Sequence, residues 1–146
     1  MAAARAYFPN YPFHYLRSVA RLGQLAAREG RLPEAAARLR EALAGMAQTG
    51  TGVIIPDALE WLAPVLSAGG RPAAAARLLG AAAAGRRATH HRREHREEPA
   101  YERAVAAVRA RLPADAFRAA WVEGEQLSPE QAVTYALAER ADADLA

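Results

Sequence analysis

Two long stretches of this sequence, 19–45 and 59–85, resemble each other at a constant offset of 40 residues. Placing Gly30 over Gly70 superposes GRLPEAAARLREALA on GRPAAAARLLGAAAA, apart from a one-residue slip at the prolines. Self-similarity with a period of roughly 20–50 residues is the signature of supersecondary units that stack and share a core. The repeat therefore predicts two copies of one helical hairpin, packed against each other.

Each copy contains the signals that end one helix and begin the next. Gly30 and Gly70 are placed to end the first helix in a left-handed conformation, which glycine adopts without a Cβ clash. Pro33 and Pro72 follow near the start of the second helix, where a missing N–H costs nothing. The predicted apolar faces of the first helices are Leu16, Val19, Ala20, Leu22, Gly23 and Ala26, then Leu59, Leu62, Ala63 and Leu66. Those of the second helices are Ala35, Ala36, Leu39 and Ala42, then Ala75, Ala76, Leu79 and Ala82.

The remaining sequence divides into a cap, a connector and a helical C-terminal segment. We expect one domain, 1–146, made of an aromatic N-terminal cap at 1–15, hairpins at 16–48 and 49–88, a basic connector at 89–98 and three helices within 99–146. The aromatic side chains of the cap are Tyr7, Phe8, Tyr11, Phe13 and Tyr15. Pro99 is expected to keep Glu98 out of helical geometry, so that the connector is exposed. In the last helix, Ser128 and Gln131 have the spacing of a capping box.

The segment from Leu22 to Ala42 reads L-G-x2-A-x3-G-x4-A-x3-L-x2-A and resembles the tetratricopeptide (TPR) repeat. The second copy keeps this framework, with Ala63 and Pro64 where the pattern has glycine and its neighbour. The offset of 40 residues between the two copies is longer than the roughly 34 residues of a standard TPR. The resemblance implies an all-α fold, a right-handed α-solenoid of TPR-like hairpins followed by the three-helix segment.

A second resemblance covers 53–138, through the blocks AARLLGAAAA, YERAVAAVRARL and AFRAAWVEGEQLSPEQAVTYALA. They are similar to the carboxyl end of large bacterial regulators that combine a signal-transduction ATPase with helical repeats, often with a LuxR-type DNA-binding domain. The most specific part is the Phe117, Trp121 and Gly124 run. The resemblance implies a regulatory or scaffold module that works with a protein partner or with upstream domains of a larger regulator.

Composition excludes several classes of protein. All 19 basic residues are Arg and the chain has no Lys, so the P-loop motif, which needs a Lys, is absent. Zero Cys excludes disulfide frameworks, zinc ribbons and thiol catalysis. A charged fraction of 24% beside 52% hydrophobic residues, 40 of them Ala, argues against general disorder. With no apolar run long enough for a membrane span, and no apolar core of a secretory signal, we expect a cytoplasmic protein.

The connector contains the one motif with an enzymatic precedent. The run from His91 to His95 matches H-x-x-E-H, which on a helix would present two zinc ligands on one face with Glu94 as the base. A catalytic zinc needs a third ligand, and three neighbouring arginines oppose a dication. We therefore expect no catalytic metal at His91 and His95. A weak, adventitious metal site that also includes His90 stays open as an alternative.

The same segment, 86–98, is also the candidate for nucleic-acid binding. It contains Arg86, Arg87, Arg92, Arg93 and Arg96, which could displace counterions from phosphates. Three glutamates interrupt the run and no aromatic side chain is interleaved for base stacking. We expect an exposed, solvated connector, and weak nucleic-acid or metal binding through it remains the alternative function.

The interaction surface is expected on the first helices of the hairpins. Its candidate residues for a weak partner-binding site are Arg17, Arg21, Gln24, Arg28 and Trp61. The sequence favours a non-enzymatic protein-interaction module that needs no cofactor, contacts no membrane and binds a protein partner. Association with a second copy of the chain is compatible with this interpretation.

Overall fold

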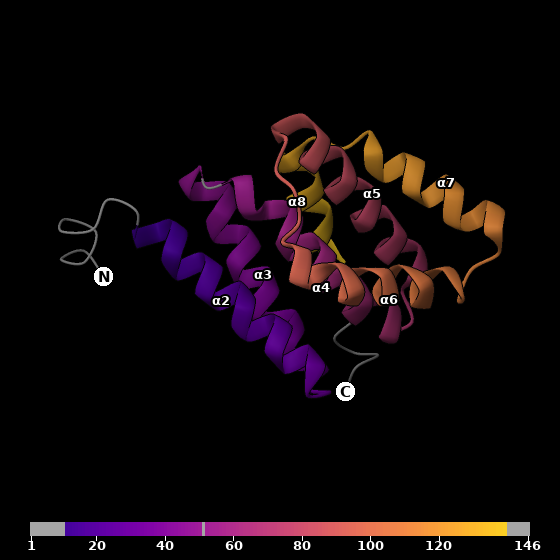
Figure 1. Cartoon of the computed structure of the whole chain (residues 1–146), viewed down its shortest axis with the longest axis horizontal. Helices are drawn as coiled ribbons and strands as arrows, with labels where there is room; N and C mark the ends of the chain where they lie inside the picture. The colour runs from indigo at the N-terminus through magenta and orange to yellow at the C-terminus, as the bar shows by residue number, and fades with distance from the viewer. Residues whose placement is uncertain (1–10, 51, 140–146) are drawn as a thin grey trace.

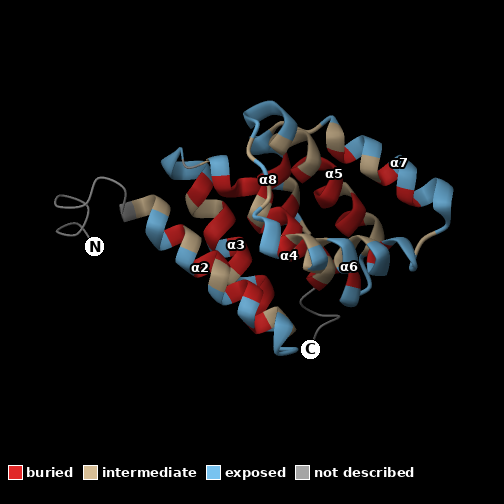
Figure 2. Ribbon diagram, in the orientation of Figure 1, coloured by how far each residue is buried: buried red, intermediate tan, exposed pale blue. Residues whose placement is uncertain are grey.

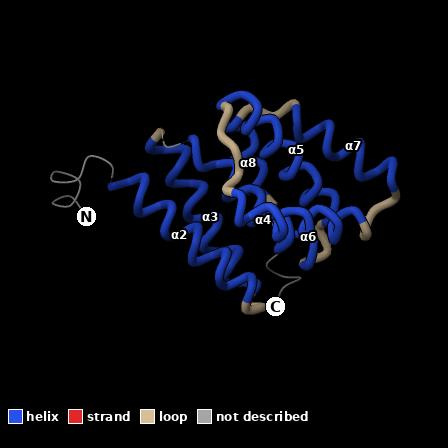
Figure 3. The backbone as a smooth tube through the Cα atoms, viewed as in Figure 1, coloured by secondary structure: helices blue, strands red, loops and turns tan. Residues whose placement is uncertain are grey.

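The computed structural model describes residues 11–50 and 52–139. Within this part, all regular structure is helical and no strand occurs (Figure 3). The α-helices are α2 (Tyr11–Arg28), α3 (Leu32–Thr49), α4 (Ile55–Ala68), α5 (Pro72–Thr89), α6 (Glu98–Arg109), α7 (Ala114–Glu125) and α8 (Pro129–Ala138). Two short 3-10 helices, η1 (Gly52–Ile54) and η2 (His95–Glu97), lie before α4 and α6. The prediction of an all-α fold is confirmed.

The turns between paired helices follow the signals in the sequence. Gly30 and Gly70 have φ values of 78° and 86°, the left-handed conformation expected at the ends of α2 and α4. Pro33 lies in the first turn of α3, and Pro72 is the first residue of α5. Helices α2 and α3 therefore form one antiparallel hairpin, and α4 and α5 form the other (Figure 1).

Helix α4 lies at the centre of the molecule. It packs on α5, α3, α6 and α2, and ten of its fourteen residues are buried. Figure 2 shows the buried surfaces concentrated where α3, α4 and α5 meet, with exposed surfaces on α6 and α7. The largest fully buried side chains are Leu39, Leu43, Met46, Leu59, Leu62, Leu66, Leu78, Leu79, Val65 and Val108. The core therefore runs through both hairpins and reaches α6.

The three predicted C-terminal helices are present, and each packs on a different part of the hairpins. Helix α6 lies against α4 and α5, α7 lies along α5, and α8 returns to α3 and α5. Ser128 and Gln131 form the expected capping box at the start of α8, with hydrogen bonds of 3.1 and 2.9 Å. Phe117 is buried, and Trp121 is half-buried against the core.

Helices α5 and α7 cross at backbone contact, and two glycines make this crossing possible. A Cβ on Gly80 would collide with the carbonyl oxygen of Trp121, and one on Gly124 would collide with that of Arg77. Since neither oxygen belongs to a movable side chain, both positions require glycine.

Three expectations about local structure are wrong. Helix α2 begins at Tyr11, so 11–15 belong to the first helix and are not a separate cap, because Pro12 is tolerated in a first turn. The rest of the cap, 1–10, lies outside the described residues. Leu22 is 50% exposed, because no helix packs on that side of α2 among the described residues. Glu98 has helical geometry, φ −56° and ψ −47°, and begins α6 with Pro99 as its second residue.

Candidate functional site

One face of α2 carries a row of polar side chains that bind two carboxylates of the connector. Arg17, Arg21, Gln24 and Arg28 are spaced by three or four residues, which places them on one side of the helix. Glu94 accepts hydrogen bonds from Arg17 at 2.7 Å and from Arg21 at 3.3 Å. Each of these four side chains was predicted to bind a partner, and each contacts a carboxylate of the connector instead.

Glu97 is the buried member of this cluster, with only 8% of its surface exposed. Its carboxylate accepts from Arg21 and from Gln24, both at 2.8 Å, and Arg28 lies 3.6 Å away. Burial alone would raise the pKa of Glu97, but the hydrogen bonds from Arg21 and Gln24 and the nearby positive charges hold it below its usual value. Glu97 is therefore a fixed anion that fastens the connector to α2.

A second ionic cluster fastens the connector to the other hairpin. Glu60 on α4 is buried and accepts from Arg86 on α5 at 2.8 Å and from Arg93 in the connector at 2.7 Å. Arg86 also donates to Asp57 at 2.6 Å, and Arg93 donates to Glu98 at 3.0 Å. Burial alone would lower the pKa of Arg86, but the carboxylates of Glu60 and Asp57 outweigh burial and raise it. Both guanidiniums thus serve to neutralise a buried carboxylate.

Each cluster also positions an aromatic ring. The guanidinium of Arg21 lies over Trp61, 4.8 Å from the ring centroid, and that of Arg93 lies over Tyr101 at 3.4 Å. Both distances are within the range of cation–π attraction. Burial raises the pKa of the Tyr101 phenol above its ordinary value. Because their arginines are themselves held by carboxylates, both rings have defined orientations.

Between these rings lies a cavity of about 300 Å³ that opens to solvent. It is bounded by α2, α4 and α6 together with the end of the connector, and we call it the α2–α4–α6 cavity. Its lining is Gln24, Ala27, Arg28, Glu60, Trp61, Pro64, Arg93, Glu97, Ala100, Tyr101, Arg103 and Ala104. Three of the predicted partner-binding residues line it, namely Gln24, Arg28 and Trp61. Arg17 and Arg21 instead border a smaller neighbouring cavity of about 80 Å³, which Trp61 also borders.

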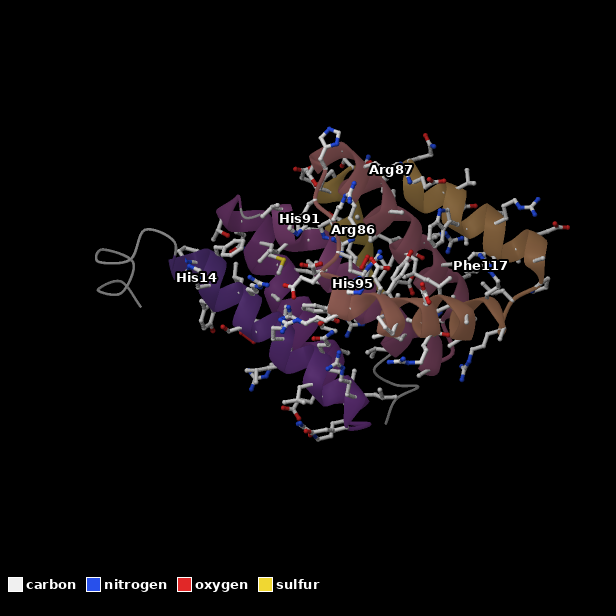
Figure 4. The ribbon with its side chains drawn as sticks, viewed as in Figure 1. His14, Arg86, Arg87, His91, His95 and Phe117 are labelled. Atoms are coloured by element: carbon white, nitrogen blue, oxygen red, sulfur yellow. The ribbon has the colours of Figure 1, made fainter. Side chains whose placement is uncertain are left out.

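The H-x-x-E-H run does not have the geometry that a zinc protease requires. Helix α5 ends at Thr89, so His91 lies in a loop and His95 in the short helix η2, and the two do not share a helical face. Figure 4 shows His91 and His95 separately placed along the connector, with His14 far away on α2. Glu94, the expected base, is paired with Arg17, Arg21 and Arg96. Among the described residues, no group of three His, Asp or Glu side chains is arranged to hold a metal ion.

The expectation that the connector is solvated throughout is wrong for Arg93 and Glu97. The side chains of Arg93 and Glu97 are only 13% and 11% exposed, because each is paired with an oppositely charged group of a hairpin. Of the other arginines considered for phosphate binding, Arg86 faces Glu60, Arg87 pairs with Glu125 at 2.6 Å, and Arg96 pairs with Glu94 at 2.8 Å. Arg92 is exposed. The positive charge of the segment is thus mostly compensated within the chain.

Sequence reasoning missed the residues that complete this site. The sequence indicates Glu97 only as a charge that interrupts the basic run, and Glu94 only as that or as the base of the H-x-x-E-H motif; it does not indicate Glu60 or Tyr101 as site residues. Their partners are far away in the sequence: Gln24 and Glu97 are 73 residues apart. The sequence does contain one indication of these partners. A row of arginines on a helix that packs against other elements needs carboxylates nearby to neutralise its charge.

No protein-family model, curated protein or solved structure matches this chain. In the part of the chain that the structure describes, none of the helices combines the length and the apolar character that a membrane span requires.

Proposed function

We propose that this chain is a non-enzymatic interaction module that binds a protein partner in the α2–α4–α6 cavity and the groove around it. The observation that carries the proposal is the cavity itself, which has apolar walls from three helices and an aromatic anchor, Trp61. Binding sites of this kind are concave and mostly apolar, with a few polar groups that fix orientation. Trp and Arg are the side chains that most often dominate the energy of an interface.

The arrangement of helices supports a TPR-like interpretation of the module. Helix α4 lies between α2 and α6, as the first helices of successive stacked hairpins do, and these three helices border the cavity. The right-handed solenoid and the role within a larger bacterial regulator belong to this proposal. The 40-residue repeat supports the solenoid. The similarity of the Phe117, Trp121 and Gly124 run to the carboxyl end of bacterial regulators supports the regulatory role.

The proposal of a non-enzymatic role is supported by the chemistry of the charged groups around the cavity. The carboxylates of Glu60 and Glu97 are each held by two or more donors, so neither is free to act as a general base. The alternative, binding of nucleic acid or metal through 86–98, has less support, because Arg86 and Arg93 face inward towards Glu60.

Site-specific photo-crosslinking tests the proposal. A benzophenone amino acid replaces Ala107, which lies one helical turn beyond Ala104 on α6, or Ala119 on the exposed surface of α7 as the control position. We expect one partner protein to crosslink from position 107 and not from 119. With that partner purified, Trp61→Ala should weaken binding about 30-fold, the loss expected for an interface hot spot. Equal crosslinking from both positions, or unchanged affinity in Trp61→Ala, would contradict the proposal.

A further inference from the structure

The α2–α4–α6 cavity has features that select the chemistry of a small ligand. Its volume of about 300 Å³ is at the lower end of the range for small-molecule sites. Its walls are apolar: Trp61 and Pro64 from α4, Ala27 from α2, and Ala100 and Ala104 from α6. The short side chains of Ala27, Ala100 and Ala104 share the lining of the cavity with the Trp61 ring, and a flat apolar group suits such a space.

The aromatic walls are fixed before any ligand binds. Trp61 is held under Arg21, which Glu94 and Glu97 hold in turn. Tyr101 is held under Arg93, which is paired with Glu60. Such preorganisation favours affinity, because a ligand does not pay for ordering the side chains that it contacts.

The charged groups of the cavity favour an anion over a cation. Its two carboxylates are already satisfied, Glu60 by Arg86 and Arg93, and Glu97 by Arg21 and Gln24. A cationic ligand would therefore have to break an existing ion pair in order to bind.

Two guanidiniums at the cavity keep donors to spare. The side chain of Arg28 is 59% exposed, and its ion pair, with Glu97, is long at 3.6 Å. Arg103 is exposed on α6, and no side-chain partner is found for it within residues 11–50 and 52–139. Both side chains line the cavity, Arg28 from α2 and Arg103 from α6, and both are exposed, so two cations border its apolar space on the solvent side. Guanidinium groups bind carboxylates through paired, charge-assisted hydrogen bonds.

We infer that the α2–α4–α6 cavity binds a small aromatic carboxylic acid, with the ring beside Trp61 and the carboxylate on Arg28 and Arg103. This inference rests on the proposed function in using the same cavity, and it adds the chemical class of small molecule that the cavity takes. Glu97 and Arg93 belong both to the cavity wall and to the connector, so a ligand in the cavity lies against the segment that is ion-paired to both hairpins.

The test uses 4-bromobenzoate as the probe and the neutral 4-bromobenzamide as its matched control. The chain has two Trp residues, so Trp121→Phe leaves Trp61 as the sole indole, and bromine quenches its fluorescence on contact. We expect saturable quenching by the benzoate with at least tenfold tighter binding than the benzamide. The double variant Arg28→Gln, Arg103→Gln should remove this difference, whereas Arg118→Gln on the exposed face of α7 should preserve it.

Equal binding of the acid and the amide, or no saturable binding of either below about 10 mM (about 2.7 kcal/mol), would overturn the inference. If Trp121→Phe does not fold, saturation-transfer NMR of the two probes on the wild-type protein makes the same comparison. The two proposals fail separately. A partner that crosslinks from position 107 while the benzoate does not bind leaves the proposed function standing, and benzoate binding without a crosslinked partner leaves only the small-molecule site.

Discussion

The two hairpins share one sequence pattern but lie in different environments. Leu39 in α3 and Leu79 in α5 are equivalent positions of the repeat, and both are fully buried. Leu22 in α2 and Leu62 in α4 are equally equivalent, yet Leu22 is 50% exposed and Leu62 is fully buried. Helix α4 has α2 on one side and α6 on the other, whereas α2 has a described neighbour on one side only. The same sequence pattern therefore forms a helical hairpin in both places, and the elements that pack against each hairpin determine which side chains are buried.

Positions 40 and 80 show the same effect for the second helices. Gly80 in α5 meets the backbone of α7, which leaves no room for a side chain. Its equivalent in α3 is Arg40, whose guanidinium donates to the carbonyl oxygen of Glu139. Helix α7 thus lies on one hairpin only, and α8 and the residue after it reach the other. The C-terminal segment breaks the symmetry that the repeat would otherwise impose.

The largest difference between the hairpins is expected from removing the equivalent leucines. Leu62→Ala should lower the free energy of unfolding by about 4 kcal/mol, because it opens a cavity in the core around α4. Leu22→Ala should lower it by less than about 1 kcal/mol, since half of that side chain is already in water. Urea denaturation of the two variants measures both values. Similar losses in both variants would mean that α2 is covered to the same degree as α4.

A somewhat smaller effect is expected at the α5–α7 crossing. Gly80→Ala should destabilise the protein by about 3 kcal/mol, because the new methyl group meets the backbone of Trp121, which cannot move aside without displacing α7. Gly45→Ala in the first hairpin is the matched control, since there the methyl group meets only the flexible side chain of Leu16. In a thermal melt, Gly45→Ala should lower the melting temperature clearly less than Gly80→Ala does. A neutral Gly80→Ala would show that α7 does not cross α5 at this glycine.

The smallest effect concerns the ionic contacts that tie the connector to the first hairpin. Glu97→Gln should cost about 2 kcal/mol at pH 7, because charge-assisted hydrogen bonds from Arg21 and Gln24 are weakened. The folded protein holds the pKa of Glu97 below its unfolded value, so this stabilisation is fully present above about pH 5. This stabilisation should decline as the pH falls through the lowered pKa of Glu97. At low pH, the wild-type protein and the Glu97→Gln variant should therefore have similar free energies of unfolding.

Denaturation series from pH 7 to pH 2.5 measure this convergence (the range spans the ordinary carboxyl pKa values, near 4). Glu130→Gln, on the exposed first turn of α8, serves as the control for removing a surface carboxylate and should cost less than about 1 kcal/mol at pH 7. A constant difference between wild type and Glu97→Gln at all pH values would mean that the charge of Glu97 contributes nothing to holding the connector.

Part of the candidate site follows from the sequence, and part does not. The heptad-like spacing of Arg17, Arg21, Gln24 and Arg28 predicts a polar row on one helix, and the structure has that row on α2. The sequence could not supply the partners of the row, because Glu94 and Glu97 lie more than 70 residues further along the chain. An arginine that faces solvent and one that faces a carboxylate look alike in a sequence.

The sequence by itself determined where α2 and α4 end and where α8 begins. The glycines at 30 and 70 and the capping box at Ser128 act within a few residues of the backbone groups that they satisfy, so local pattern suffices to predict them. Only the tertiary structure decided which side of α2 is covered, which charges of the connector are buried, and that a cavity lies beside Trp61. Burial and ion pairing depend on groups brought together by packing, and the free energy of a charge is set by those distant neighbours.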